Sequence, residues 1–280
     1  MFSKLIVLYI VLFSILNATN NSMQDMCKKN IDTIRTKAKN GDTAKQYLMG
    51  IIYKNGFCVK KDLIKAFQYF SMSNLNGYPL AKFDLAEMYY YGEGTKINYK
   101  KSYELYNKIL IDSHRDAIIK AKLGYMYLKG KGVDKNLFMA KKLYEESAEL
   151  GNLDASYNLG LMYMSGLGVD KNISKAIEYL NIPATSNNPF YHDQPKVKYY
   201  LARALYEQNN KKYKDMILEL ITMSAIEGFV DAQVTLGKNY IDGEDLNRDM
   251  KKAKYWIQKA KKQNSTKAIE LWNEHRLWKY

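Results

Sequence analysis

A helical pattern of apolar residues, broken by glycine-rich turns, recurs along this chain. In its clearest copy, Ala155, Leu159 and Tyr163 lie four residues apart and therefore share one face of a helix. Gly166 and Gly168 follow, and glycine readily adopts the positive φ angles that end a helix and reverse the chain. Each copy of the pattern therefore predicts a helix, a tight turn and a second helix.

The turn has a fixed length, because a Tyr precedes an Asp or Asn by nine residues six times along the chain. An Asp or Asn at the start of a helix accepts hydrogen bonds from free amides of the first turn. We therefore expect each of the six to be the N-cap of a second helix. In five copies a small residue follows four positions later and begins the apolar stripe of that helix. The pairs are Tyr53/Asp62, Tyr89/Asn98, Tyr127/Asn136, Tyr163/Asn172, Tyr206/Asp215 and Tyr240/Asp249. The small residues are Ala66, Ser102, Ala140, Ala176 and Ala253.

Successive Tyr residues of these pairs lie 36, 38, 36, 43 and 34 positions apart. A period in this range is typical of a solenoid, in which each unit buries its apolar face only by stacking on its neighbours. The sequence thus predicts an all-α solenoid of about six helix–turn–helix repeats over residues 43–264. The fifth repeat is degenerate, because Gln208, Asn209 and Asn210 stand where the turn glycines are expected.

The segments outside the regular repeats have their own patterns. Residues 181–195 hold three of the four prolines and predict a surface loop, either a plain linker or a contact element. Residues 19–42 are expected to cap the first repeat. Residues 265–280 predict a final helix whose apolar side chains cover the other end of the stack. These side chains are Ile269, Trp272 and Trp278.

The first eighteen residues have the pattern of a signal peptide. Lys4 precedes an apolar run over residues 5–16, and a small polar patch follows. Twelve helical residues span roughly 18 Å, which is shorter than the ~30 Å hydrocarbon core of a bilayer. A cleaved signal over residues 1–18 is therefore favoured over a membrane anchor. We expect the protein to be exported, periplasmic or secreted, with membrane contact only through this signal.

The two cysteines, Cys27 and Cys58, both follow the expected cleavage point. An even cysteine count in an oxidising compartment favours a disulfide over two unpaired thiols. Cys58 falls in the first turn and Cys27 in the capping segment, so their disulfide would close the end of the first repeat. Two cysteines and three scattered histidines do not supply a zinc site, and we expect no metal or cofactor.

The net charge of +14 favours an acidic partner. The lysines are spread over every repeat with no run of five or more, which indicates a basic solvated surface. Nucleic acid is not an expected partner, because an exported protein meets little of it. The 25 tyrosines fall mostly at repeat positions, where packing between helices is the ordinary role of such rings.

The residues Leu159-Gly160, Tyr163, Gly166, Gly168-Val169, Asn172 and Ala176 form a pattern that resembles the Sel-one-like repeat (SLR). The resemblance covers about residues 43–264. It implies a right-handed α/α superhelix related to the tetratricopeptide repeats, and it implies adaptor work rather than catalysis. Some secreted, cysteine-rich SLR members carry a β-lactamase label, so a hydrolase of β-lactam or cell-wall substrates is the alternative. Against it, no Ser-x-x-Lys nucleophile motif occurs in the chain.

By analogy with the tetratricopeptide repeats, first-helix positions around each Tyr should line a concave groove for a protein or peptide partner. In this chain those positions form an aromatic-rich strip, and an exposed apolar strip would mark a binding groove. The alternative is that the same side chains pack between adjacent first helices. The residues expected to line the groove are Tyr47, Phe83, Tyr90, Tyr125 and Tyr157, with Lys54, Glu87, Ala121, Leu128, Leu161, Met164, Val234 and Lys238 beside them.

Overall fold

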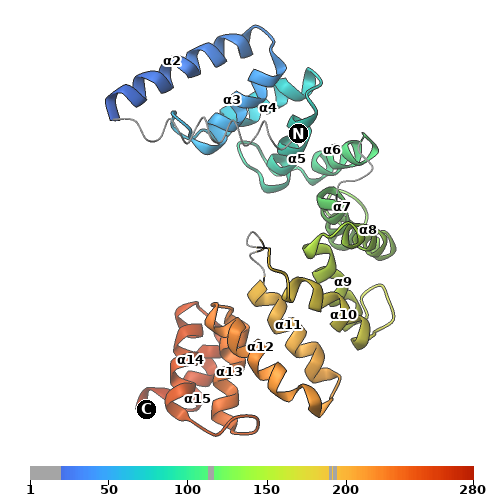
Figure 1. Ribbon diagram of the computed structural model, residues 1–280, viewed down its shortest axis with the longest axis vertical. Coiled ribbons are helices and arrows are strands. Elements are labelled where there is room, and N and C mark those ends of the chain that lie inside the picture. Colours follow the sequence, from blue (N-terminus) through green and yellow to red (C-terminus); the bar gives the residue numbers. More distant parts are fainter. Residues whose placement is uncertain (1–19, 113–116, 189–190, 192–193) are drawn as a thin grey trace. The chain divides into compact units, whose positions relative to one another are not determined.

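The computed structural model describes residues 20–112, 117–188, 191 and 194–280, except for the side chains of residues 20–28, 111 and 112. Every regular element in these residues is a helix, which confirms the all-α repeat fold (Figure 1). The α-helices are α2 (Asn20–Lys39), α3 (Thr43–Asn55), α4 (Leu63–Leu75), α5 (Pro79–Tyr91), α6 (Tyr99–Asp112), α7 (Ala117–Lys129), α8 (Leu137–Glu149), α9 (Leu153–Ser165), α10 (Ile173–Ala184), α11 (Gln194–Glu207), α12 (Lys214–Ile226), α13 (Val230–Asp242), α14 (Met250–Lys262) and α15 (Thr266–Glu274). The 3₁₀ helices are η1 (Lys211–Tyr213) and η2 (Leu277–Lys279).

The chain divides into two compact units. Unit 1 comprises residues 1–115 and 129–135, and unit 2 comprises residues 116–128 and 136–280. Within unit 1, helices α2 to α6 pack in chain order, each against the next. Within unit 2, helices α8 to α15 pack in the same way. Each helix thus buries its apolar face mainly against its neighbours in sequence, which is the nearest-neighbour packing of a solenoid.

A backbone hydrogen bond explains why nine residues separate the Tyr from the Asp or Asn. In five repeats the amide of the Asp or Asn donates to the carbonyl of the Tyr over 2.8–3.0 Å and closes the turn. The side chain of the same residue accepts from an amide of the second helix at 2.9–3.0 Å. The predicted N-caps are therefore confirmed in five repeats. They are Asp62, Asn98, Asn136, Asn172 and Asp249.

A glycine three positions before the Tyr brings the two helices of a repeat close together. A Cβ added to Gly160 would lie 2.5 Å from the Cγ atom of Leu180, a side chain that is fully buried. A Cβ added to Gly50 would lie 2.5 Å from the ring of Phe70 in the first repeat. The close helix approach predicted at Gly160 is therefore confirmed.

Four of the lysines have a structural role that composition did not indicate. In four repeats a lysine three positions after the N-cap places its ammonium group 5.2–5.3 Å from the centre of the Tyr ring. Such a cation–π contact contributes about 0.5–1 kcal/mol at an exposed site. Part of the positive charge therefore stabilises the turns. The contacts are Lys65 with Tyr53, Lys101 with Tyr89, Lys175 with Tyr163 and Lys252 with Tyr240.

The fifth repeat departs from the prediction. Tyr206, its expected buried Tyr, is 68% exposed, whereas the preceding Leu205 is 2% exposed. Asp215, its expected N-cap, lies inside the first turn of α12, whose N-cap residue is Tyr213. The prediction that Tyr206 and Asp215 form a sixth motif pair is therefore wrong, and their spacing of nine is coincidental.

The buried stripe of α11 shows where the repeat continues. Val197, Leu201 and Leu205 lie four positions apart and are each at most 2% exposed. Ala202 takes the place of the motif glycine and packs against Ile221 of α12. Leu205 is therefore the residue that corresponds to the motif Tyr in this repeat. We call the residue at this position of each repeat the anchor. It is Tyr in the first four repeats and in the sixth, and Leu205 in the fifth.

The segments outside the repeats also differ in part from expectation. The loop expected over residues 181–195 is shorter, because α10 continues to Ala184 with Pro183 in its last turn, and both residues are buried. At the C-terminal end Leu277 is fully buried, whereas Trp278 is 51% and Ile269 is 39% exposed. Leu277 therefore covers the stack where Trp278 was expected to do so. The expected signal over residues 1–18 and the side chain of Cys27 lie outside the described residues.

Candidate functional site

The surface expected to bind a partner consists of the residues six and two positions before each anchor and one position after it. We call these residues the first-helix strip. Most of its described members are buried or half-buried, so it is not the exposed apolar band of a hydrophobic groove. Among the residues predicted to line the groove, the half-buried ones are Tyr47, Phe83, Tyr90 and Tyr125, and the buried one is Tyr157.

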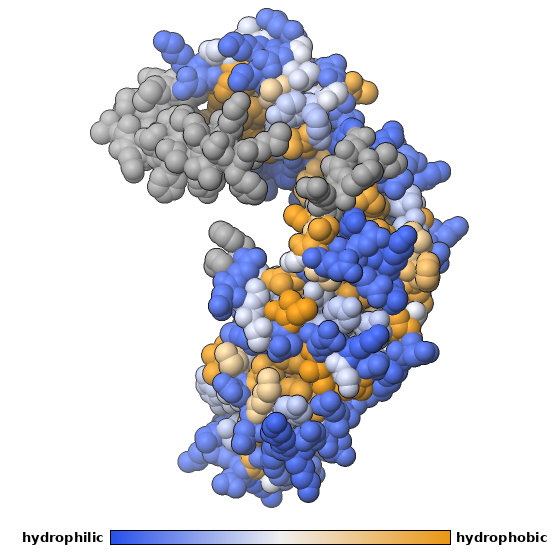
Figure 2. All heavy atoms as spheres, turned by 45° about the vertical axis from the view of Figure 1, so that its right-hand side comes forward, coloured by the Kyte–Doolittle hydropathy of each residue, from blue (hydrophilic) through white to orange (hydrophobic). Residues whose placement is uncertain are grey.

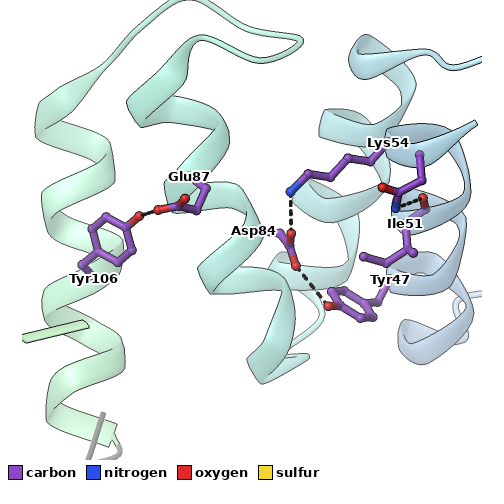
Figure 3. Close-up of polar contacts among 7 residues, drawn as sticks. Tyr47, Ile51, Lys54, Asp84, Glu87 and Tyr106 are labelled. Carbon is purple, nitrogen blue, oxygen red and sulfur yellow. Dashed lines mark hydrogen bonds and ion pairs between the residues drawn. The ribbon is translucent and has the colours of Figure 1, made fainter. Parts of the chain in front are cut away.

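In unit 1, Tyr47 bridges two adjacent first helices. Its hydroxyl donates to Oδ2 of Asp84 at 3.0 Å, and Lys54 Nζ donates to Oδ1 of the same carboxylate at 2.9 Å. Figure 3 shows Tyr47 and Lys54 converging from α3 on Asp84 of α5. Burial, and then the negative charge of Asp84, raise the pKa of Tyr47 well above its ordinary value. The tip of Tyr47 is thus engaged within the solenoid.

Phe83 and Glu87 contact the second helix of their own repeat. The ring centre of Phe83 lies 6.1 Å from that of Tyr106, a fully buried residue of α6. The hydroxyl of Tyr106 donates to the carboxylate of Glu87 (Figure 3). Burial raises the pKa of Tyr106, and the hydrogen bond to Glu87 adds to that shift. Phe83 and Glu87 therefore hold α5 against α6.

Tyr90 forms part of a cluster with a lysine between two aromatic rings. Lys131 Nζ donates to the hydroxyl of Tyr90 at 3.0 Å and lies 4.7 Å from the centre of its ring. The same nitrogen lies 4.6 Å from the ring centre of Tyr99. Hydrogen bonding to Tyr90 raises the pKa of Lys131. The half-buried Tyr90 is therefore engaged in packing within unit 1.

In unit 2, Tyr157 is a core residue and not a groove residue. It is 5% exposed, as little as Tyr163 at 6%, and it packs in a cluster with Leu201. Lys196 Nζ lies 4.6 Å from the centre of its ring. Tyr125 is half-buried and packs beside a second core cluster. The prediction that Tyr157 faces a partner is therefore wrong, because the adjacent helices cover its ring.

One contact recurs between adjacent first helices. The residue six positions before one anchor meets the residue five positions before the next anchor. This contact engages the aromatic strip residues within the fold and favours the alternative that they pack between helices. The contacts are Tyr47 with Asp84, the rings of Tyr157 and Tyr200 at 5.9 Å, and the hydroxyls of Tyr199 and Thr235 at 3.3 Å.

Three described strip residues are exposed, and all belong to the fifth and sixth repeats: Arg203, Tyr206 and Lys238. We call these three residues the cationic patch. Arg203 and Lys238 lie two positions before their anchors, on α11 and α13, and Tyr206 lies one position after Leu205. Tyr206 is exposed because Leu205 takes the buried position. The four-residue spacing of Val197, Leu201 and Leu205 was the signal in the sequence that could have revealed this register.

The remaining surface is mixed. On the face drawn in Figure 2, apolar and hydrophilic residues are interspersed along unit 2, and its C-terminal end is largely hydrophilic. No cluster of three or more His, Cys, Asp or Glu side chains suited to a metal ion occurs among the described residues. Within the same part of the chain, no helix combines the length and apolarity needed to cross a membrane.

Comparison with known proteins identifies the repeat. Five segments match the Sel1 repeat, at residues 46–78, 79–109, 120–152, 153–182 and 230–265, which is more than half of the chain. The unmatched stretch between the last two segments contains α11 and α12, the helices of the degenerate fifth repeat. The helix pair is thus retained where the sequence signature is lost.

Curated relatives match over short stretches. The mouse protein sel-1 homolog 2 is 33% identical over 75 residues, which is 27% of this chain and 11% of that protein. The Arabidopsis thaliana protein HRD3A, an ERAD-associated E3 ubiquitin-protein ligase component, is 30% identical over 96 residues, 34% of this chain and 14% of that protein. The chain thus corresponds to a small part of the length of these relatives.

Solved structures match over most of the chain. A Sel1 repeat protein from Oxalobacter formigenes has a TM-score of 0.67 and 27% identity, covering 80% of this chain and 89% of that one. A protective antigen of uropathogenic Escherichia coli that displays an SLR fold has a TM-score of 0.58 and 24% identity, covering 86% of this chain and 58% of that one. Together, the turn geometry, the packing and the five matched segments show that the chain belongs to the Sel1 repeat family.

Proposed function

We propose that this protein is an exported Sel1 repeat scaffold that binds a protein or peptide partner through its first-helix strip and has no catalytic activity of its own. The observation that carries the proposal is the cationic patch, in which an exposed Tyr and Arg share one face of α11. Tyr and Arg are the side chains most often found as binding hot spots. The strip residues Tyr157 and Tyr199 of the same unit are engaged in packing and so supply a rigid support for this patch.

The relatives support a scaffold function. HRD3A is by name a component of an E3 ubiquitin-protein ligase. The apolar run and the polar patch at the start of the sequence support export. The net charge of +14 favours an acidic partner.

Site-specific photocrosslinking tests the proposal. The protein carries benzoylphenylalanine at position 206 and is irradiated in an envelope extract of the source cells. We expect discrete adducts that mass spectrometry identifies as one or a few proteins. Position 255 on α14 is the matched control, because Tyr255 is also an exposed tyrosine, at 51%, but lies outside the strip. The same adducts at both positions, or none at position 206, would contradict binding through the strip.

A further inference from the structure

We infer that the cationic patch binds a carboxylate side chain of an acidic peptide segment, with Arg203 as the main cation and Lys238 as a second cation. This inference rests on the proposed function and names the chemistry of the partner. It follows from the position of Arg203, from the pairing of the charges around it and from the exposed ring beside it.

Two aromatic rings position the guanidinium group of Arg203. Its central carbon lies 5.9 Å from the ring centre of Tyr199 and 5.6 Å from that of Tyr200. Tyr199 is itself fixed by its contact with Phe229, at 5.3 Å between ring centres, and by Thr235. A planar guanidinium group held in this way keeps its donors available for the two oxygens of a carboxylate. The site is therefore preorganised for a bidentate contact.

Two carboxylates of this region have other partners. Glu207, one turn after Arg203 on α11, pairs with Lys171, and Glu227 pairs with Lys198 at 2.6 Å. Asp231 is close enough to influence the pKa of Tyr200, which burial raises and Arg203 lowers. Among the described residues, however, no carboxylate oxygen lies within 4.0 Å of Arg203. An exposed Arg that lies over two rings, with no carboxylate in the described part of the chain at ion-pair distance, offers its charge to a partner.

Lys238 extends the positive charge to the next repeat. It occupies the position in the sixth repeat that Arg203 occupies in the fifth, and both side chains are exposed. Its only described carboxylate neighbour is Asp242, one turn further along α13 at 4.0 Å, which is the limit of an ion pair. Two cations at equivalent positions on adjacent first helices match a segment with more than one acidic residue.

Tyr206 indicates what flanks the acidic residue. Its ring is 68% exposed and lies three positions after Arg203, on the same face of α11. A rigid ring beside the charged Arg203 favours an apolar or aromatic residue next to the carboxylate of the peptide. We therefore expect a motif in which Asp or Glu adjoins an apolar residue.

Selection from a random library of twelve-residue peptides, displayed on phage, tests this chemistry and does not require the natural partner to be identified first. The library is selected on the full chain. Each enriched peptide is then synthesised in its original form and in forms in which one Asp or Glu is replaced by Asn or Gln. We expect enriched peptides to share a carboxylate whose amide twin binds about tenfold or more weakly, as a charge-assisted hydrogen bond implies. Arg203→Gln should weaken binding of the acidic peptide by the same factor. It should also abolish the difference in affinity between the acidic peptide and its amide twin.

Arg248→Gln is the matched control, because Arg248 is an exposed arginine of unit 2 outside the strip and the variant loses the same charge. It should leave peptide affinity unchanged. Peptides that bind Arg203→Gln as tightly as the parent would refute the inference while leaving the scaffold function intact. Failure to enrich any peptide would count against both. Displacement of the peptide by a short single-stranded oligonucleotide as readily as by an acidic peptide would assign the patch to phosphate instead.

Discussion

The anchor tyrosine makes three contacts, two through its ring and one through its backbone carbonyl. In the fourth repeat the ring of Tyr163 is 6% exposed and stacks on Tyr179, with ring centres 5.7 Å apart and planes 3° from parallel. Lys175 lies over it at 5.2 Å, and its backbone carbonyl closes the turn to Asn172. The Tyr is therefore both a core residue and the support of the turn.

Replacing the anchor should cost far more stability than replacing an exposed tyrosine. Tyr163→Ala should lower the free energy of unfolding by roughly 3–5 kcal/mol, as for other buried aromatic residues. Tyr206→Ala should change it by less than about 0.5 kcal/mol, because that ring is exposed. Urea unfolding followed by circular dichroism measures both. Similar losses in the two variants would contradict the assignment of Leu205 as the anchor.

Tyr47 should make stability depend on alkaline pH. The raised pKa of its hydroxyl in the folded state means that the folded chain keeps a proton that the unfolded chain loses above about pH 10. Its contribution is therefore complete below pH 10 and is lost as the pH rises further, because the folded state then binds more protons than the unfolded state. Tyr47→Phe should remove roughly 1–2 kcal/mol at pH 8.

The test compares urea midpoints between pH 8 and pH 11. The parent protein should lose more stability over this range than Tyr47→Phe does. Tyr206→Phe, which removes an exposed hydroxyl, serves as the control and should retain the slope of the parent protein. Equal slopes for the parent and Tyr47→Phe would show that the pKa of Tyr47 is not raised in the folded state.

At the scale of the element, the turn length and the helix caps follow from local chemistry and could be predicted. Asn172 caps α10 because a side-chain oxygen at that position meets free amides whatever the rest of the fold does. The fifth repeat could not be placed from the nine-residue spacing alone, because Tyr206 and Asp215 have that spacing by chance. Leu205 replaces Tyr because burial at the anchor requires an apolar side chain, and either residue satisfies it.

The exposure of the first-helix strip was the feature least predictable from the sequence. Its positions follow from the helical period, but their exposure depends on what the adjacent first helix places opposite them. Tyr157 is covered because Tyr200 lies against it, and Tyr47 is engaged because Asp84 accepts its hydroxyl. Neither partner is fixed by the repeat motif, so exposure could not be derived from one repeat at a time.

The second turn glycine is where consecutive repeats touch within a unit. A Cβ at Gly168, which has φ +73°, would lie 2.5 Å from the Cβ of Leu137 in the preceding repeat. Gly151 has φ +84° but no atom within 4 Å of such a Cβ. Gly151→Ala should therefore cost only backbone strain, roughly 1 kcal/mol, whereas Gly168→Ala should add a steric cost of roughly 1–3 kcal/mol.

Thermal unfolding of both variants measures this difference. Gly168→Ala should have the lower midpoint, and hydrogen exchange should rise in α8, whose first residue is Leu137, as well as in α9. Equal midpoints for the two variants would mean that the repeats do not touch at this glycine.

At the scale of the whole molecule, the ends of a solenoid differ from its middle, because a terminal repeat has one neighbour instead of two. The turn of the first repeat reflects this. Cys58 stands where later repeats have the second glycine, and it has a positive φ of 58°. At the equivalent Gly94, a Cβ would lie 2.0 Å from the carbonyl oxygen of Leu63 in the preceding repeat. Among the described residues, the element before α3 is the single helix α2 and not a helix pair, which leaves room for the side chain of Cys58.

That opening supports the prediction of a disulfide between Cys58 and Cys27. The helix that carries Cys27, α2, packs on α3 and takes the place of a preceding repeat. Closing the loop between the two residues should stabilise the first repeat by roughly 3–4 kcal/mol on the chain-entropy account. Because each repeat interacts with its neighbours alone, reduction should raise hydrogen exchange in α3 and α4 and leave α9 and α10 unchanged.

Intact mass and hydrogen exchange test the disulfide in protein purified from its export compartment. The unreduced protein should weigh about 2 Da less than the reduced protein, because two hydrogens are lost on oxidation. Cys27→Ser should reproduce the effect of reduction on hydrogen exchange. The double variant, Cys27→Ser with Cys58→Ser, should show no more exchange than either single variant. Two alkylatable thiols in the native protein would exclude the bond. Loosening of α9 and α10 on reduction would instead show that stability is shared along the array and not limited to neighbouring repeats.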